Sequence, residues 1–187
     1  MKKGKLIVIS GPSGVGKGTI IKELLNKNDK FELSISMTSR IIRNGEKDGV
    51  NYYFKTKEEF EIEIKKGNLL EWAKYNDNYY GTPKSEIEDR INNGKNVILE
   101  IEVDGALQIK NMMKDDSILI FLLPPSMEEL KNRLLKRNTD SIESINNRLK
   151  IAEKEIEISK KYDYRIVNED INKTVNEIEN IIKNEIN

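Results

Sequence analysis

The chain has 187 residues, and its 32 basic and 32 acidic side chains give a formal net charge of zero. It contains no Cys and no His, which excludes disulfides, thiol nucleophiles, Ser-His-Asp catalysis and imidazole metal ligands. The balanced charge argues against a polybasic nucleic-acid binder, and the apolar runs are far shorter than the roughly 18 to 20 residues of a membrane span. We therefore expect one cytoplasmic domain over 1–187, with no nucleic-acid or membrane partner.

Short runs rich in Ile, Val and Leu predict strands that are buried on both faces of a parallel sheet. These runs are residues 5–9, 96–101, 117–123 and 164–167. A helical pattern follows each strand, at residues 16–26, 104–113, 126–136 and 171–186. Alternating strands and helices are typical of an α/β domain in which helices flank a parallel sheet core.

Two segments interrupt this alternation. Residues 33–80 contain short β-like pieces at 33–36, 52–54 and 69–75 around a helix at 57–66. A capping box, Thr56 to Glu59, starts that helix, so the segment predicts a small α+β insertion. Residues 137–148 break the helical periodicity and predict a mobile excursion between two helices.

A phosphate-binding sequence lies between the first strand and the first helix. It has the pattern GxxxxGK, in which glycines let the backbone wrap a phosphate and the helix N-terminus adds positive charge. A purely structural glycine-rich turn is the weaker alternative, since strand, helix and Lys are all in place. The residues predicted to bind a nucleotide triphosphate are Gly11, Pro12, Ser13, Gly14, Val15, Gly16, Lys17, Gly18 and Thr19.

One departure concerns the metal. Gly18 stands where the pattern usually has Ser or Thr, so the hydroxyl that helps to hold Mg²⁺ is expected from Thr19, together with water.

The insertion carries a second candidate site. Arg40 and Arg43 lie three residues apart in a turn-prone stretch, which suggests a phosphate monoester as ligand, although two solvated loop arginines are the alternative. Tyr52 and Tyr80 supply hydroxyl groups nearby in the sequence, and Glu71 is a carboxylate within an apolar stretch.

Seven segments, in the same order, resemble the motifs of guanylate kinases, which are P-loop nucleoside monophosphate kinases. They are residues 11–19, 38–46, 48–52, 70–73, 78–82, 99–106 and 162–168. The resemblance implies a P-loop kinase fold with a GMP-binding insertion at about 33–82 and a helical lid at about 137–159. The core would then comprise residues 1–32, 83–136 and 160–187.

The resemblance also implies a GMP site. Its residues would be Ser36, Arg40, Arg43, Tyr52, Glu71, Tyr80, Thr82 and Glu100. Glu71 would accept the N1–H and N2–H₂ of guanine side by side, with Thr82 or Ser36 left for O6. Adenine presents an acceptor at that edge, so we expect GMP and dGMP to be used over AMP.

On the ATP side the resemblance adds Arg133 and Asn168, and it makes Lys17, Arg137 and Arg148 catalytic. A turn Asn is the alternative for Asn168. The lid has Asn138 where the family usually has Gly, and Glu102 and Asp104 stand where it often has Asp and Gln. Asp104 has the alternative role of capping the next helix.

The implied activity is transfer of the γ-phosphoryl group of ATP to GMP, with Mg²⁺ as cofactor. The acceptor is already an oxyanion, so no general base is needed and the lack of His is no obstacle. A catalytically inactive guanylate-kinase-like binding module is the alternative, disfavoured because Lys17 and the lid arginines are present. A homo-oligomer stays open.

Overall fold

The computed structural model describes residues 3–75, 77–136 and 141–186. Its centre is a five-stranded parallel sheet in the order β2-β7-β1-β8-β9. The strands are β1 (Leu6–Ser10), β2 (Phe31–Leu33), β7 (Asn96–Glu100), β8 (Ser117–Leu123) and β9 (Tyr164–Val167). The parallel sheet core flanked by helices confirms the predicted fold class.

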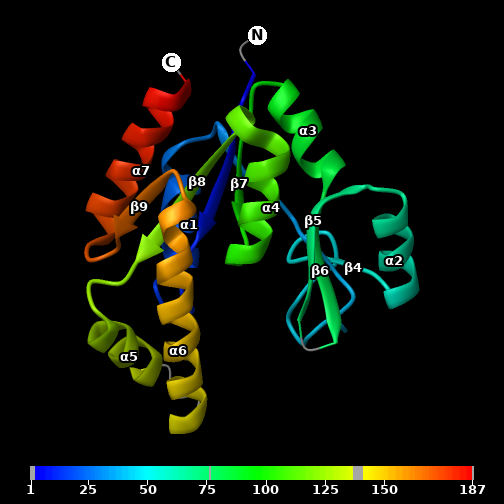
Figure 1. The fold of residues 1–187 in the computed structure, drawn as a ribbon. Coiled ribbons are helices and arrows are strands. Elements are labelled where there is room, and N and C mark those ends of the chain that lie inside the picture. Colours follow the sequence, from blue (N-terminus) through cyan, green and yellow to red (C-terminus); the bar gives the residue numbers. More distant parts are fainter. Residues whose placement is uncertain (1–2, 76, 137–140, 187) are drawn as a thin grey trace.

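Helices cover both faces of this sheet (Figure 1). Side chains alternate along β1, so Ile7 and Ile9 join one buried cluster while Leu6 and Val8 join the other. The first cluster includes side chains of α1 (Lys17–Lys27) and α7 (Ile171–Ile186), and the second includes those of α3 (Lys84–Asn92) and α4 (Val103–Met113). Two 3₁₀ turns, Lys114–Asp116 and Ser159–Lys161, precede β8 and β9.

Strand β2 corrects one expectation. The sequence predicts a β-like piece at 33–36 within the insertion, whereas the strand is Phe31–Leu33 and lies at the edge of the main sheet beside β7. Burial of Phe31 in the core holds it there. Three residues are too few to show a periodicity, and α3 is likewise not among the predicted helices.

The predicted α+β insertion is a second sheet, in the order β4-β3-β6-β5, with α2 packed beside it (Figure 1). Its elements are β3 (Met37–Thr38), β4 (Tyr53–Phe54), α2 (Lys57–Lys65), β5 (Leu69–Tyr75) and β6 (Asn78–Pro83). Thr56 and Glu59 form the predicted capping box at the start of α2.

Helices α5 (Met127–Lys136) and α6 (Ile142–Ile158) form an arm with its own small apolar cluster. The expectation of an excursion through residue 148 is wrong from Ile142 onward. Ser141 accepts a hydrogen bond from the Ser144 amide and so caps α6, and Ile145 packs in the apolar cluster. The predicted residues Arg137 and Asn138 lie outside the described part of the chain.

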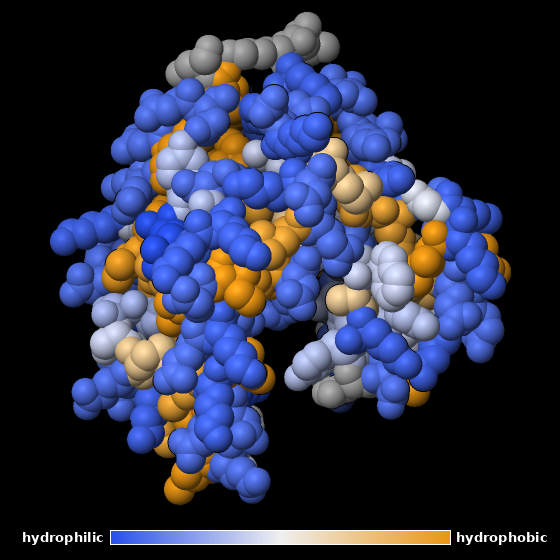
Figure 2. Space-filling model, in the orientation of Figure 1, coloured by the Kyte–Doolittle hydropathy of each residue, from blue (hydrophilic) through white to orange (hydrophobic). Residues whose placement is uncertain are grey.

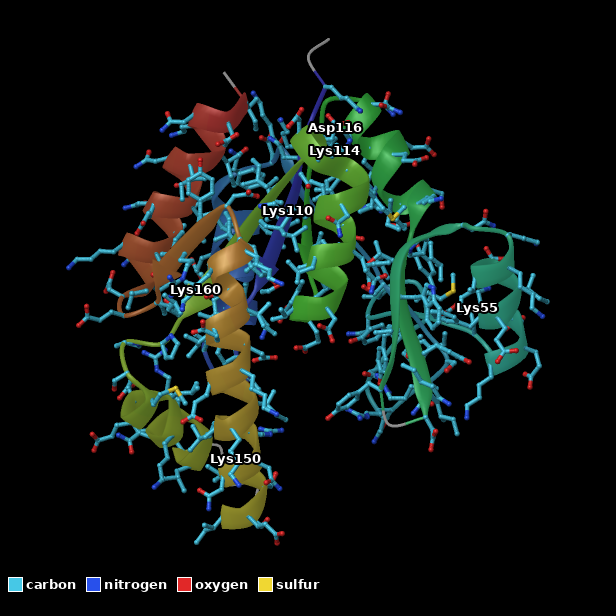
Figure 3. The ribbon with its side chains drawn as sticks, viewed as in Figure 1. Lys55, Lys110, Lys114, Asp116, Lys150 and Lys160 are labelled. Atoms are coloured by element: carbon cyan, nitrogen blue, oxygen red, sulfur yellow. The ribbon has the colours of Figure 1, made fainter. Side chains whose placement is uncertain are left out.

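The arm and the insertion stand on opposite sides of an open cleft, which the space-filling view shows as a hollow (Figure 2). Lys150 marks the arm and Lys55 the insertion (Figure 3). Within the described ranges, the helices include none that is long and apolar enough to span a lipid bilayer.

Candidate functional site

The glycine-rich loop follows β1 and ends at the N-terminus of α1. Gly14 and Gly16 have left-handed φ values of 91° and 106°, which other residues rarely adopt. A Cβ atom at Gly14 would also lie 2.8 Å from Leu134 Cδ2. Gly16 is the N-cap of α1 and has no side chain to cap the helix, so the first backbone N–H groups of α1 are available to an anion.

The loop borders a cavity of about 450 Å³. The cavity is lined by Ser13, Gly14, Gly16, Lys17, Gly18, Thr19, Glu100 and Glu102. Six of the nine residues predicted for the triphosphate are in this lining. Gly11, Pro12 and Val15 are not part of the lining. The carbonyl oxygens of Gly11 and Pro12 accept hydrogen bonds from Lys17 Nζ at 2.6 and 3.4 Å, and Val15 is fully buried.

Val15 connects this loop to two residues predicted for ATP binding. Asn168 Nδ2 donates to the Val15 carbonyl oxygen at 2.8 Å, and Arg133 donates to the same oxygen at 3.2 Å. Asn168 Oδ1 accepts from the Thr174 hydroxyl, and Arg133 also donates to the Asn168 carbonyl and to Glu129. Arg133 and Asn168 therefore support the backbone of the phosphate loop from the protein side.

Carboxyl groups form the opposite wall of the cavity. Glu100 ends β7 and Glu102 is the N-cap of α4, which leaves Asp104 in the first turn of that helix rather than at its cap. Burial raises the pKa of Glu100, while the nearby Lys17 ammonium lowers it.

Glu155 on α6 lies against Glu102 of this wall and is not among the residues predicted from the sequence. Burial raises the pKa of Glu155 to about 7, helped by the charge of Glu102 and by a hydrogen bond between the two carboxyl groups. Repulsion by the neighbouring Glu102 charge favours the protonated form of Glu155. A usable signal was its place one helical turn after the buried Ala152, on the inward side of an otherwise charged helix.

Arg148 lies two helical turns before Glu155 on the same side of α6, about 10 Å farther along the axis. Its side chain is half-buried. The arm thus joins a predicted catalytic arginine to the cavity wall through one rigid helix.

In the insertion, Arg40 is held in place by Glu46. Its two terminal nitrogens donate to the two carboxylate oxygens at 2.8 and 3.0 Å, and the guanidinium lies 5.5 Å from the centre of the Tyr52 ring. This pairing raises the pKa of Arg40 and lowers that of Glu46. The Arg43 amide also donates to Glu46, while the Arg43 side chain is exposed. Glu46 was not predicted as a site residue, although it follows the two arginines directly.

Tyr52 and Tyr80 meet edge to face, with ring centres 6.1 Å apart. Burial raises the pKa of Tyr52, and the charges of Tyr80 and Glu100 act in the same direction. Since Glu100 also lines the cavity, the insertion site and the phosphate-loop cavity adjoin at this residue.

Glu71 lies deeper in the insertion. A register shift between Leu69 and Glu71 bulges β5 against β6, and the side chain of Glu71 is only 5% exposed. The Thr82 hydroxyl donates to Glu71 Oε1 at 2.6 Å. Burial raises the pKa of Glu71 to about 7, and the Thr82 hydrogen bond opposes this. Ser36, before β3, is half-buried.

Comparison with known proteins shows that this chain is similar to guanylate kinases. Residues 3–185 match the family described as guanylate kinase. The guanylate kinase of Clostridium tetani is 54% identical over 185 residues, which cover 99% of this chain and 88% of that protein. The guanylate kinase of Oceanobacillus iheyensis is 52% identical over 184 residues, with coverage of 98% and 89%.

Solved structures agree. The crystal structure of guanylate kinase from Anaplasma phagocytophilum has a TM-score of 0.79 and 38% identity, covering 99% of this chain and 87% of that chain. A gluconokinase from Sinorhizobium meliloti, at 13% identity and a TM-score of 0.55, shares the fold alone; the match covers 100% of this chain and 95% of that one.

Proposed function

The chain belongs to the guanylate kinase family, and from this premise we propose how its residues divide between two nucleotides. The enzyme transfers the γ-phosphoryl group of ATP to GMP and forms ADP and GDP. The buried Glu71–Thr82 pair carries the assignment of the acceptor, because a buried carboxylate is costly unless hydrogen-bond donors satisfy it, and guanine presents two adjacent N–H donors.

ATP binds at the cavity beside the phosphate loop. Backbone N–H groups of the loop and of the first turn of α1 surround the phosphates. The Lys17 ammonium, which contacts the Gly11 and Pro12 carbonyl oxygens and has three N–H donors, donates to a phosphate oxygen. Arg133 and Asn168 contribute by fixing the Val15 carbonyl and hence the shape of the loop.

The residues around the cavity fit Mg²⁺ bound largely through phosphates and water. Thr19, Glu100 and Glu102 offer oxygen atoms, which Mg²⁺ prefers. Across the described ranges, acidic side chains do not gather into a group of three that could hold a metal alone. When bound, Mg²⁺ neutralises phosphate charge during transfer.

GMP binds in the insertion. Arg40, Arg43, Tyr52 and Tyr80 hold its phosphate, and Glu71 accepts the two adjacent N–H groups of guanine. Because the Thr82 hydroxyl already donates to Glu71, Ser36 is the hydroxyl left for guanine O6. Glu100 lies between the two sites, where its carboxylate would accept hydrogen bonds from water that surrounds Mg²⁺.

In the transfer step an oxygen of the GMP phosphate bonds to the γ-phosphorus while the bond to the β,γ-bridging oxygen breaks. Lys17, Arg137 and Arg148 stabilise the charge that spreads over the moving group. Closing of the arm on the cleft brings Arg137 and Arg148 to the phosphates and excludes water.

A coupled assay of ADP release tests the proposal. With Mg-ATP, we expect turnover with GMP and dGMP but not with AMP, CMP or UMP, and none for Lys17→Ala. Folded protein that turns over no acceptor would instead support the binding-module alternative. The cytoplasmic location and a homo-oligomeric state stay predictions, which cell fractionation and sedimentation would test.

A further inference from the structure

Gly105 stands in the first turn of α4, where its backbone does not need glycine. It is not among the described glycines with a left-handed φ, and glycine in a helix is less favourable than alanine. The residue is also buried. The reason for glycine at this position must therefore be steric.

The space is used by Glu71. A Cβ atom at position 105 would lie 2.7 Å from Glu71 Oε2 and 3.2 Å from Glu71 Cδ. A separation of 2.7 Å is well inside carbon–oxygen contact distance. Ile101 Cδ1 would lie at 3.2 Å from the same Cβ atom.

Burial and a hydrogen bond restrict how far the Glu71 side chain can move away from a Cβ atom at position 105. Its other oxygen, Oε1, accepts the 2.6 Å hydrogen bond from Thr82, and only 5% of the residue is exposed. A side chain at position 105 would push one carboxylate oxygen while Thr82 holds the other, so the plane of the carboxylate would turn.

Helix α4 is also fixed. Val103, Ala106 and Ile109 pack in the buried core. One turn after Gly105, the Gln108 amide group contacts the backbone of Trp72, accepting from its N–H at 3.5 Å and donating to its carbonyl at 3.3 Å. At the far end, Lys110 (Figure 3) binds Asp163 at 2.5 Å.

We propose that Gly105 is a positioning residue for guanine selection: its missing side chain lets the buried Glu71 carboxylate lie against α4 in the orientation that accepts both guanine N–H groups. This inference rests on the proposed role of Glu71 at the guanine edge. A pair of parallel hydrogen bonds requires both oxygens to be placed correctly, so turning the carboxylate weakens at least one of them.

The variant Gly105→Ala tests this, with Asn111→Ala, an exposed position on the same helix, as the matched control. We expect Gly105→Ala to fold, since turning of the Glu71 carboxylate makes room for one methyl group and alanine favours the helix. Its kcat/KM for GMP falls about tenfold or more, mainly through KM, by analogy with other small misplacements in active sites. KM for ATP stays within about twofold, and Asn111→Ala behaves as wild type.

The double variant Gly105→Ala/Glu71→Ala separates a positioning role from general damage. If Gly105 acts through Glu71, adding Gly105→Ala to Glu71→Ala causes no further loss with GMP. Should Gly105→Ala alone fail to fold, folding of the double variant supports the inference, because removing the carboxylate relieves the contact.

Three results would overturn the inference: normal GMP kinetics in Gly105→Ala, an equal loss in both backgrounds, or failure of both variants to fold. The proposed function fails differently. In that case Glu71→Ala itself leaves GMP use unchanged.

Discussion

Replacing Glu71 by Gln is expected to stabilise the protein while it removes GMP recognition. The folded-state pKa of Glu71 is about 7 against an ordinary value of 4.5, so the folded protein binds this proton more tightly than the unfolded chain does. Such a group contributes stability below pH 4.5 that is lost as the pH rises through about 7. Gln is neutral at every pH and keeps an acceptor for the Thr82 hydroxyl.

The size of the effect follows from the two pKa values. Relative to a side chain that stays neutral, Glu71 lowers the free energy of unfolding by about 1.4 kcal/mol at pH 5.5 and about 3 kcal/mol at pH 8. The advantage of Glu71→Gln over wild type should therefore grow by about 2 kcal/mol between these pH values. The amide of Gln would face the guanine N–H donors with a donor of its own, so kcat/KM for GMP should fall by about 10³-fold or more.

Urea unfolding of both proteins at pH 5.5 and pH 8, together with initial rates at pH 8, measures both effects. A Glu71→Gln variant that is less stable than wild type at pH 8, or that has wild-type kcat/KM for GMP, would contradict this prediction.

Further predictions concern the two sites. KM for GMP should rise about tenfold from pH 8 to pH 6 as Glu71 takes up its proton. Initial rates over this pH range measure the rise, and Glu71→Gln, measured in parallel, shows how much of it comes from titration of the GMP phosphate. If KM depends on pH in the same way in both proteins, Glu71 is not the group responsible. Glu46→Gln should loosen Arg40 and raise KM for GMP about tenfold while KM for ATP is unchanged; equal effects on both substrates would contradict this. Asn168→Ala should raise KM for ATP and lower the unfolding free energy by about 1–3 kcal/mol, because the buried Thr174 hydroxyl loses its acceptor and the Val15 carbonyl loses its Asn168 donor; a variant of wild-type stability would argue against this support. Arg148→Ala should reduce kcat far more than ATP affinity, and parallel losses in kinetics and direct ATP binding would indicate ground-state binding instead.

The main sheet could be predicted because burial leaves a local signal. Strands β1, β7 and β8 contain continuous apolar runs, β9 has an Ile-Val pair, and the sequence bounds of α7 agree with Ile171–Ile186 in the structure. Strand β6 escaped prediction because Gly81 and Pro83 disfavour a strand by propensity. Its pairing with β5 compensates for this and supplies the partner that local sequence cannot show.

The same distinction between local sequence patterns and contacts of distant segments applies to the site. The phosphate loop and the arginine pair are local patterns, so their residues were predicted directly. Contacts between distant segments were not: Asn168 reaches Val15 across 153 residues, and Glu155 meets Glu102 only because α6 packs back on the cavity. The role of Gly105 likewise depends on how closely α4 approaches β5.

The most direct test of the account is to identify both products chromatographically after incubation of the enzyme with Mg-ATP and GMP or AMP. We expect one GDP for each ADP with GMP, and no phosphorylated acceptor with AMP. ADP formed without GDP, or AMP phosphorylated as readily as GMP, would contradict it.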